Sequence, residues 1–288
     1  MLLLALLAPA CGTSPDSADS GDETGDIATD LRTLDTCATT LADDVPSFYS
    51  SYFRCLDASM DGDDVLLTTS NLPPHPSAYY NDDDPNHEAW DDRGGDYVQN
   101  PNRLTEQLFQ VRIPTNPVPK GLVVTAAMHD LTAGTSREEY PMGHAGVALD
   151  GVSLYNAVAG PGMDIREEKY TFDSWEGHPS PDGAYHHHSP NSASLAVLAH
   201  LGAGALELFG IMCDGTVVLG CTELDGSAPG LSDADAQQGH LHDLTDAAGT
   251  THFLDRYHIH MCAALEPDAF TPEIQYYEAC GVVGGGPP

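Results

Sequence analysis

Histidines recur in a repeated pattern along this chain, and their spacing could build metal sites. The first copy of the pattern has G-x-x-x-D-G at 146–151, G-H at 177–178 and Y-H-x-H at 185–188. The second copy has the same three parts in the same order, at 210–215, 239–240 and 257–260. Chance rarely repeats three linked parts in one order, so we predict an internal duplication.

Each Y-H-x-H segment is expected to be a strand, in which alternate side chains share a face. His186 and His188 would then form one pair, with His258 and His260 as the other, while His187 takes the place of Ile259 and points away. A third imidazole would come from the preceding G-H, with His75 or His242 as a supplement. The candidate metal ligands are His75, His178, His186, His188, His240, His258 and His260.

Three imidazoles around one point suit zinc or copper, and the sequence does not separate the two metals. Two other uses of these histidines remain open. One is a metallohydrolase, with Asp173 or Glu176 as the base near His178; no H-E-x-x-H or G-x-S-x-G motif occurs. The other is a buried hydrogen-bond network that only supports the fold. Asp150 and Asp214 are interpreted as turn residues.

Charge narrows the range of partners. The 288 residues include 44 acidic and 10 basic ones, for a formal net charge of −34. Phosphate binding needs clustered Lys and Arg, so nucleic acid is excluded as a partner, and attraction to anionic lipid is excluded likewise. Repulsion among the carboxylates predicts a fold that salt stabilises.

The N-terminus predicts export and lipid anchoring. Residues 1–10 read MLLLALLAPA and precede Cys11, so that 8–11 resembles a bacterial lipobox. We therefore expect a signal peptide at 1–11, a membrane partner through a lipid on Cys11, and a place in the bacterial cell envelope. Residues 12–36 are expected to be a disordered acidic tether, and 37–288 the folded domain.

Six further cysteines in an exported chain favour disulfides. Six cysteines allow 15 pairings, and we predict pairs between sequential neighbours. These pairs are Cys37–Cys55, Cys213–Cys221 and Cys262–Cys280.

The patterning predicts a mainly β fold, a β-rich α+β domain. Strands are expected at 65–70, 109–113 and 252–262, and Asp-Gly turns predict hairpins at 147–155 and 211–219. Residues 193–201 fit a short helix or a buried strand, with His200 in the core. Residues 80–92 are expected to be a long acidic loop. Duplicated hairpin-plus-strand halves, at about 143–192 and 207–264, would form one compact domain.

Several segments between 65 and 262 resemble the bacterial YHYH-domain proteins. They are S-N-L-P-P-H-P at 70–76, N-P-N-R-L-T-E-Q at 100–107, I-P-T-N-P at 113–117, G-V-A-L-D-G-V-S-L-Y at 146–155, and the Y-H-x-H segments at 185–188 and 257–260. The resemblance implies a secreted domain with a histidine site. We therefore expect an exported, lipid-anchored protein whose two Y-H-x-H strands build a transition-metal site. The alternatives are a metal-dependent hydrolase and a non-catalytic structural or adhesive surface module.

Overall fold

The computed structural model describes residues 31–91, 93–118, 143–157, 159 and 164–262. The predicted signal peptide, Cys11 and most of the predicted tether lie outside these ranges. The folded unit begins at Leu31. Arg32 is already fixed to it, because its backbone N–H donates to Asn86 Oδ1 at 2.7 Å and its Nε to the Leu72 carbonyl at 2.9 Å.

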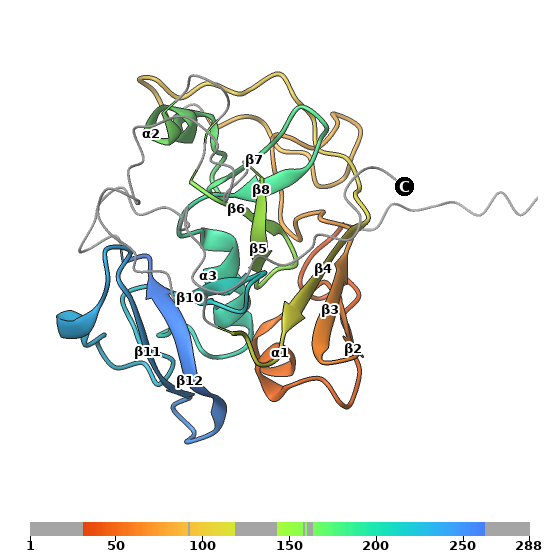
Figure 1. Cartoon of the computed structure of the whole chain (residues 1–288). Coiled ribbons are helices and arrows are strands. Elements are labelled where there is room, and N and C mark those ends of the chain that lie inside the picture. The colour runs from red at the N-terminus through yellow and green to blue at the C-terminus, as the bar shows by residue number, and fades with distance from the viewer. Residues whose placement is uncertain (1–30, 92, 119–142, 158, 160–163, 263–288) are drawn as a thin grey trace, which may run out of the picture. The chain divides into compact units, whose positions relative to one another are not determined.

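Most of the regular structure is β, in two mixed sheets (Figure 1). The smaller sheet has the order β1 (Thr40–Leu41), β2 (Asp57–Asp61), β3 (Asp64–Thr69) and β4 (Phe109–Pro114). The sheet confirms the strands predicted at 65–70 and 109–113. Side chains along β3 alternate between more and less buried, as a strand with one face on the core requires.

The larger sheet has eight strands, in the order β11-β12-β10-β9-β5-β6-β8-β7. Their bounds are β5 (His144–Ala148), β6 (Ser153–Tyr155), β7 (Gly177–Pro179), β8 (Tyr185–His187), β9 (Leu208–Met212), β10 (Val217–Leu219), β11 (Gly239–Thr245) and β12 (Thr251–His260). Both Asp-Gly hairpins and the strand predicted at 252–262 are confirmed. In each turn the aspartate Oδ1 accepts a backbone N–H two residues on, from Val152 at 3.1 Å and from Thr216 at 2.9 Å.

The two halves of the larger sheet contain corresponding strands, arranged symmetrically about the centre of the sheet. The hairpin β5–β6 corresponds to β9–β10, β8 to β12, and β7 to β11. The central strands β5 and β9 pair antiparallel with Val147 opposite Ile211, and Gly146 and Ala148 face Met212 and Gly210. His178 pairs with His186 as His240 pairs with His258. The two copies of the motif therefore have the same strand pairing; their origin by duplication stays a prediction.

One apolar core joins the two sheets. Phe48 and Phe53 from the segment around α1 (Ser47–Tyr52) cluster with Leu67 of the smaller sheet and with Val147 and Ile211 of the larger one. On the opposite face of the larger sheet, Tyr257 and Ile259 join a second cluster with Leu154 and Val218. Since side chains alternate along β12, His258 and His260 lie on the face of the first core.

The helices are short. In the described ranges they are α1, α2 (Ile165–Glu168), α3 (Ser192–His200) and the 3-10 turns η2 (Lys169–Thr171) and η3 (Leu231–Asp233). Residues 193–201 are thus mostly helical, with Asn191 Oδ1 capping Ser194 N–H at 2.8 Å. The expectation that His200 is a core residue is wrong, because its place at the end of α3 exposes it. No helix among the described residues has the length and apolarity needed to cross a bilayer.

Disulfides confirm one predicted pair and correct the others. Cys37 is bonded to Cys55, as expected. Cys221 is bonded to Cys262, which rules out the predicted pairs Cys213–Cys221 and Cys262–Cys280. Cys213 is disulfide-bonded as well. The reason for the correction is topological: β10 and β12 pair in parallel, so the residues that follow them emerge side by side although 41 positions separate them. Such bonds are typical of extracellular proteins.

Candidate metal centres

The first histidine cluster comprises His178, His186 and His188. His178 on β7 and His186 on β8 are cross-strand partners, and His188 follows two positions later on the same face. All three are buried, and the Nε2 atoms of His186 and His188 lie 3.0 Å apart. One ligand atom from each residue falls within 4.8 Å of the others.

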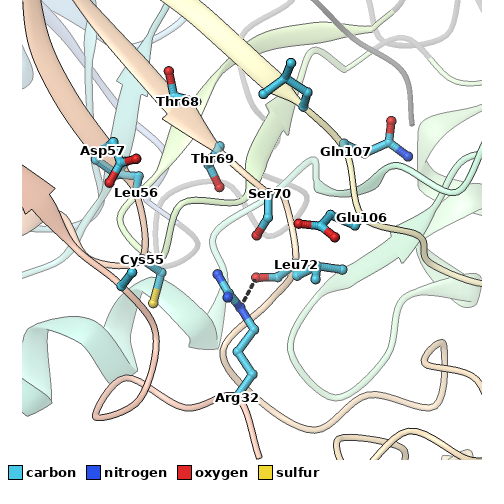
Figure 2. A pocket seen from close by; sticks show the side chains of 12 residues that line it. Arg32, Cys55, Leu56, Asp57, Thr68, Thr69, Ser70, Leu72, Glu106 and Gln107 are labelled. Atoms are coloured by element: carbon cyan, nitrogen blue, oxygen red, sulfur yellow. Dashed lines mark hydrogen bonds between the residues drawn. The ribbon is translucent and has the colours of Figure 1, made fainter. Parts of the chain in front are cut away.

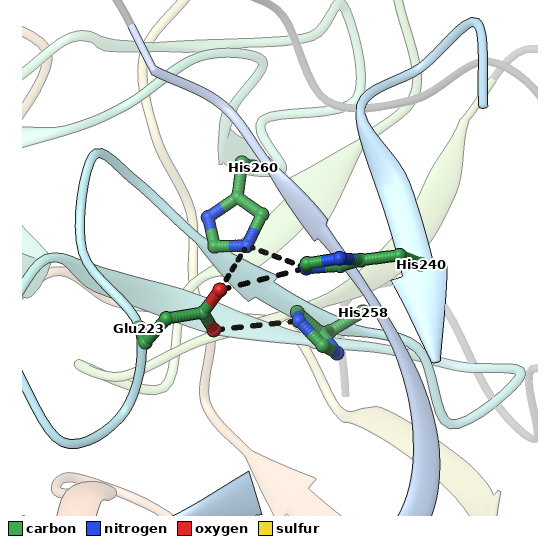
Figure 3. A group of neighbouring side chains, drawn as sticks. All are labelled: Glu223, His240, His258 and His260. Atoms are coloured by element: carbon green, nitrogen blue, oxygen red, sulfur yellow. Dashed lines mark hydrogen bonds and ion pairs between the residues drawn. The ribbon is translucent and has the colours of Figure 1, made fainter. Parts of the chain in front are cut away.

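The second cluster repeats this arrangement and adds a carboxylate. It comprises His240 on β11, His258 and His260 on β12, and Glu223 from the loop after β10 (Figure 3). The Nε2 atoms of His240 and His260 are 3.2 Å apart. The Glu223 carboxylate lies 3.5 Å from the Nε2 atoms of His258 and His260 and 3.6 Å from that of His240. The four side chains face one common point.

Backbone carbonyls fix the tautomer of four of these histidines. Nδ1 of His186 bonds the Ala184 carbonyl at 2.9 Å, and Nδ1 of His258 bonds the Arg256 carbonyl at 3.0 Å. Nδ1 of His188 and of His260 bond the carbonyls of Asn156 and Gly220, at 2.6 and 2.8 Å. A carbonyl only accepts, so each Nδ1 carries the proton and each neutral ring presents an Nε2 lone pair.

His178 is held in the same tautomer by a hydroxyl. Thr171 donates its hydroxyl proton to the Glu168 carbonyl at 2.8 Å, so its oxygen accepts from His178 Nδ1 at 2.6 Å. The buried His178 Nε2 has no hydrogen-bond partner in the structure. All three rings of the first cluster therefore direct lone pairs inward.

Converging lone pairs favour a cation. The unprotonated Nε2 atoms of His186 and His188, 3.0 Å apart, repel each other unless a positive charge lies between them. Two nitrogens bound tetrahedrally to one zinc ion at ~2.0–2.1 Å would be about 3.3 Å apart. Outer hydrogen bonds from ligand Nδ1–H groups to carbonyls are also typical of metal sites. The donor set thus fits a transition metal at both clusters.

Burial keeps the first cluster uncharged. It lowers the pKa of His178 and His186 well below the ordinary value, with help from neighbouring imidazoles, and it lowers the pKa of His188 to about 4. In the second cluster, burial would raise the pKa of Glu223, but the neighbouring imidazoles of His258 and His260 outweigh it and lower that pKa. Glu223 is therefore a carboxylate.

Sequence reasoning missed both carboxylates near the clusters. Glu223 belongs to the second cluster, and Glu168 Oε1 lies 3.7 Å from His178 Nε2 in the first. The two glutamates do not occupy matching positions of the repeat, and nothing in the local sequence distinguishes them from the other acidic residues. Only the fold identifies them.

The two carboxylates predicted as bases have structural roles instead. Asp173 accepts the Tyr185 hydroxyl at 2.8 Å and Ser77 Oγ at 2.5 Å, and Tyr185 lies on the opposite face of β8 from His186. Glu176 accepts the backbone N–H of Ser192 at 2.7 Å. Asp235 repeats the part of Asp173, because Tyr257 donates to it at 2.6 Å. A shared D-x-x-[EQ]-G-H pattern, at 173–178 and 235–240, was the available signal for these turns.

His75 joins neither three-histidine cluster. It lies with Asp150 and His187 on the other face of β8, and its ring stacks on Trp175 with centroids 4.4 Å apart. His187 points away from its neighbours in the chain, as predicted. His242 does approach the second cluster, with Nε2 3.2 Å from Glu223 Oε2.

A cavity of about 490 Å³ borders the second cluster. Glu223, His240 and His242 contribute to its wall, together with Asp225 and Asp233. The second cluster therefore adjoins a space that a small molecule could enter.

Fold and site together define a mixed β protein with two buried histidine clusters. One cluster lies on the strand pair β7–β8 and the other on β11–β12, at opposite ends of the larger sheet. The family described as YHYH protein matches residues 111–236. The matched segment includes the first cluster, whereas the histidines of the second cluster lie beyond it. No curated protein and no solved structure matches the chain.

Proposed function

We propose that this protein binds two transition-metal ions, zinc or copper, one at each histidine cluster. The observation that carries the proposal is the shared tautomer: ring Nδ1–H groups are tied to fixed acceptors, so that Nε2 lone pairs converge. A buried network that only supported the fold would pair donors with acceptors, whereas these nitrogens face each other.

The sequence left open whether the two histidine clusters form one site, and the strand order supports two separate sites. The strands β8 and β12 stand five steps apart in the sheet order, a separation on the order of 20 Å at ~4.8 Å per step. Six histidines therefore form two groups of three. Elemental analysis should find one ion per cluster in protein refolded with zinc or copper and dialysed.

Paired variants test the assignment. His186→Asn with His188→Asn should remove one ion per chain, and His258→Asn with His260→Asn should remove the other. His200→Asn is the control, because this exposed residue belongs to neither cluster. Wild-type protein without stoichiometric metal would leave the structural-network interpretation as the better one.

We also propose that the protein is exported and held at the bacterial cell envelope by a lipid on Cys11. The lipobox-like sequence at 8–11 supports anchoring, and the disulfides support export. A Cys11→Ser variant should move from the membrane fraction to the soluble fraction. Equal partitioning of both forms would contradict the anchor.

A second candidate function is hydrolysis at the second cluster. The bordering cavity favours it, because a hydrolytic metal needs room for water and substrate. The Glu223→Gln variant distinguishes two roles of Glu223. If the variant loses the metal, Glu223 is a metal ligand. If the variant keeps the metal but no longer hydrolyses an ester or phosphoester, Glu223 is the general base. Absence of metal-dependent hydrolysis by wild-type protein would reject this candidate.

A further inference from the structure

A third group of ligand-type side chains lies outside both histidine clusters. It comprises His75, Asp150 and His187, which come from three separate parts of the chain. One ligand atom of each falls within 4.8 Å of the others. All three side chains are buried, and Asp150 and His187 have no exposed surface.

The three atoms that face one another all lack a hydrogen-bond partner in the structure: His75 Nε2, Asp150 Oδ2 and His187 Nε2. The far side of each residue is occupied. His75 Nδ1 bonds the Pro76 carbonyl and His187 Nδ1 the Glu176 carbonyl, both at 2.9 Å, while Asp150 Oδ1 accepts the Val152 N–H. The tautomer is thus the one found in the two histidine clusters, with Nε2 lone pairs aimed at a common point.

A simple ion pair does not account for this arrangement. His187 Nε2 and Asp150 Oδ2 are 3.9 Å apart, beyond hydrogen-bond distance. A proton on His187 would still leave His75 Nε2 without a partner, and burying unpaired polar atoms is costly. An ion at the centre would satisfy all three atoms at once.

The second half of the larger sheet offers a comparison. Asp214 makes the same turn as Asp150, but Ile259 stands at the position of His187. There Arg256 Nη1 donates to the Gly215 carbonyl, beside Asp214, at 3.0 Å. The position that corresponds to Arg256 is Ala184, so the first half supplies two imidazoles where the second supplies a guanidinium.

Another cation, Arg32, acts on Asp150 only through space. Its side chain lies in a pocket of about 350 Å³ with Cys55 and Leu72, and its Nε donates to the Leu72 carbonyl (Figure 2). Arg32 therefore leaves the three facing atoms without a direct contact.

We infer that His75, Asp150 and His187 form a third metal site, which binds a divalent ion of the zinc class through two imidazoles and one carboxylate. Zinc takes mixed histidine and carboxylate ligands, and three protein ligands leave one coordination position for water. The ion neutralises the buried Asp150 and ties the turn of the β5–β6 hairpin to β8 and to the segment around His75.

Zinc content per chain tests this site in the full-length protein, purified with zinc and passed through a gel-filtration column. Asp150→Asn should lower the zinc content by one equivalent, since the amide preserves the turn but weakens the ligand. Asp214→Asn, which makes the same change in the matching turn, should leave the zinc content unchanged. Equal zinc in wild type and Asp150→Asn would show a water-filled group instead and would overturn the inference.

His187→Ile provides a second variant, because the matching position on β12 already holds Ile259. It should lose the same single equivalent, and the double variant with Asp150→Asn should lose no more than one. Loss of two equivalents by the double variant would mean different ions and would overturn the inference. This site is independent of the two histidine clusters: if those bind nothing, wild type should still hold one zinc, and the His187→Ile variant none.

Discussion

At the scale of single residues, burial decides what each imidazole can do. His144 illustrates this outside the metal clusters, between Phe109 and Tyr155, with ring centroids 4.6 and 4.7 Å away. Desolvation lowers the pKa of His144 to about 4, because a charged ring is poorly solvated there. The ring therefore stays neutral at pH values where histidines of the unfolded chain already take up protons.

The pH dependence of stability follows from that difference. Between pH 6.5 and 4, His144 is protonated in the unfolded state but not in the folded state. The free energy of unfolding therefore decreases as the pH is lowered through this window. The loss from this residue should be about 2 kcal/mol at pH 5, because pH 5 lies ~1.5 pH units below the ordinary histidine pKa and each unit is worth ~1.36 kcal/mol. His144→Gln should lose less stability than wild type between pH 7.5 and 5 in urea denaturation. The exposed His200→Gln should behave as wild type; parallel curves for all three proteins would contradict the prediction.

At the scale of elements, the sheet explains which histidines meet. Period two on β8 and β12 was readable from the sequence, and it correctly paired His186 with His188 and His258 with His260. Asp-Gly turns likewise predicted both hairpins. What the sequence could not supply were contacts made by distant or irregular segments, such as Glu223 in a loop, or His75 opposite a histidine 112 positions away. Two of the three predicted cysteine pairs failed for the same reason, because pairing depends on strand order.

The disulfide Cys221–Cys262 should support the second cluster. Cys221 follows Gly220, whose carbonyl orients His260, and Cys262 follows β12 by two residues. Replacing both cysteines by Ser should lower stability by up to about 4 kcal/mol, as expected for closing a loop of this length. It should also weaken metal binding at the second cluster, because the Gly220 carbonyl that orients His260 is no longer held in place by the neighbouring disulfide.

Competition titration with a chromophoric chelator measures this effect. The matched control is Cys37→Ser with Cys55→Ser, a bond remote in sequence from either cluster. That control should lower stability by about 3 kcal/mol without changing metal affinity. Equal loss of affinity in both double variants would show a general effect of destabilisation.

Close strand contact at the centre of the larger sheet requires glycine. A Cβ on Gly146 would come within 2.4 Å of the Ile211 carbonyl oxygen, and one on Gly210 within 2.2 Å of the Val147 oxygen. Gly146→Ala should therefore force β5 and β9 apart and cost at least about 1–3 kcal/mol, the range for overpacking. Gly204→Ala is the control, since its Cβ would meet Ala199 at an ordinary 3.7 Å. Equal denaturation midpoints for the two variants would refute the argument.

At the scale of the whole molecule, charge opposes the compact state. The formal net charge is −34, and ten basic residues cannot compensate 44 acidic ones. Within the part of the chain that the structure describes, few carboxylates have an arginine partner: Asp61 pairs with Arg112 at 2.6 Å, Asp164 with Arg166 at 2.5 Å and Asp82 with Arg103 at 4.0 Å. Bound divalent ions would reduce the excess of negative charge only near their binding sites. The remaining repulsion is long-range and should respond to ionic strength.

The melting temperature should therefore rise with sodium chloride between 0.05 and 1 M, because the Debye length shrinks from roughly 14 Å to 3 Å over that range. Replacing Asp82, Asp83 and Asp84 by Asn removes three charges from an exposed acidic loop and should flatten the salt dependence in proportion. Asparagine at position 84 keeps an acceptor for the Asn86 N–H, so the turn is preserved. Potassium chloride should act like sodium chloride if the effect is screening rather than specific binding. A melting temperature independent of salt would mean that the acidic surface is already compensated by neighbouring groups, and the triple variant would then melt at the same temperature as wild type in low salt.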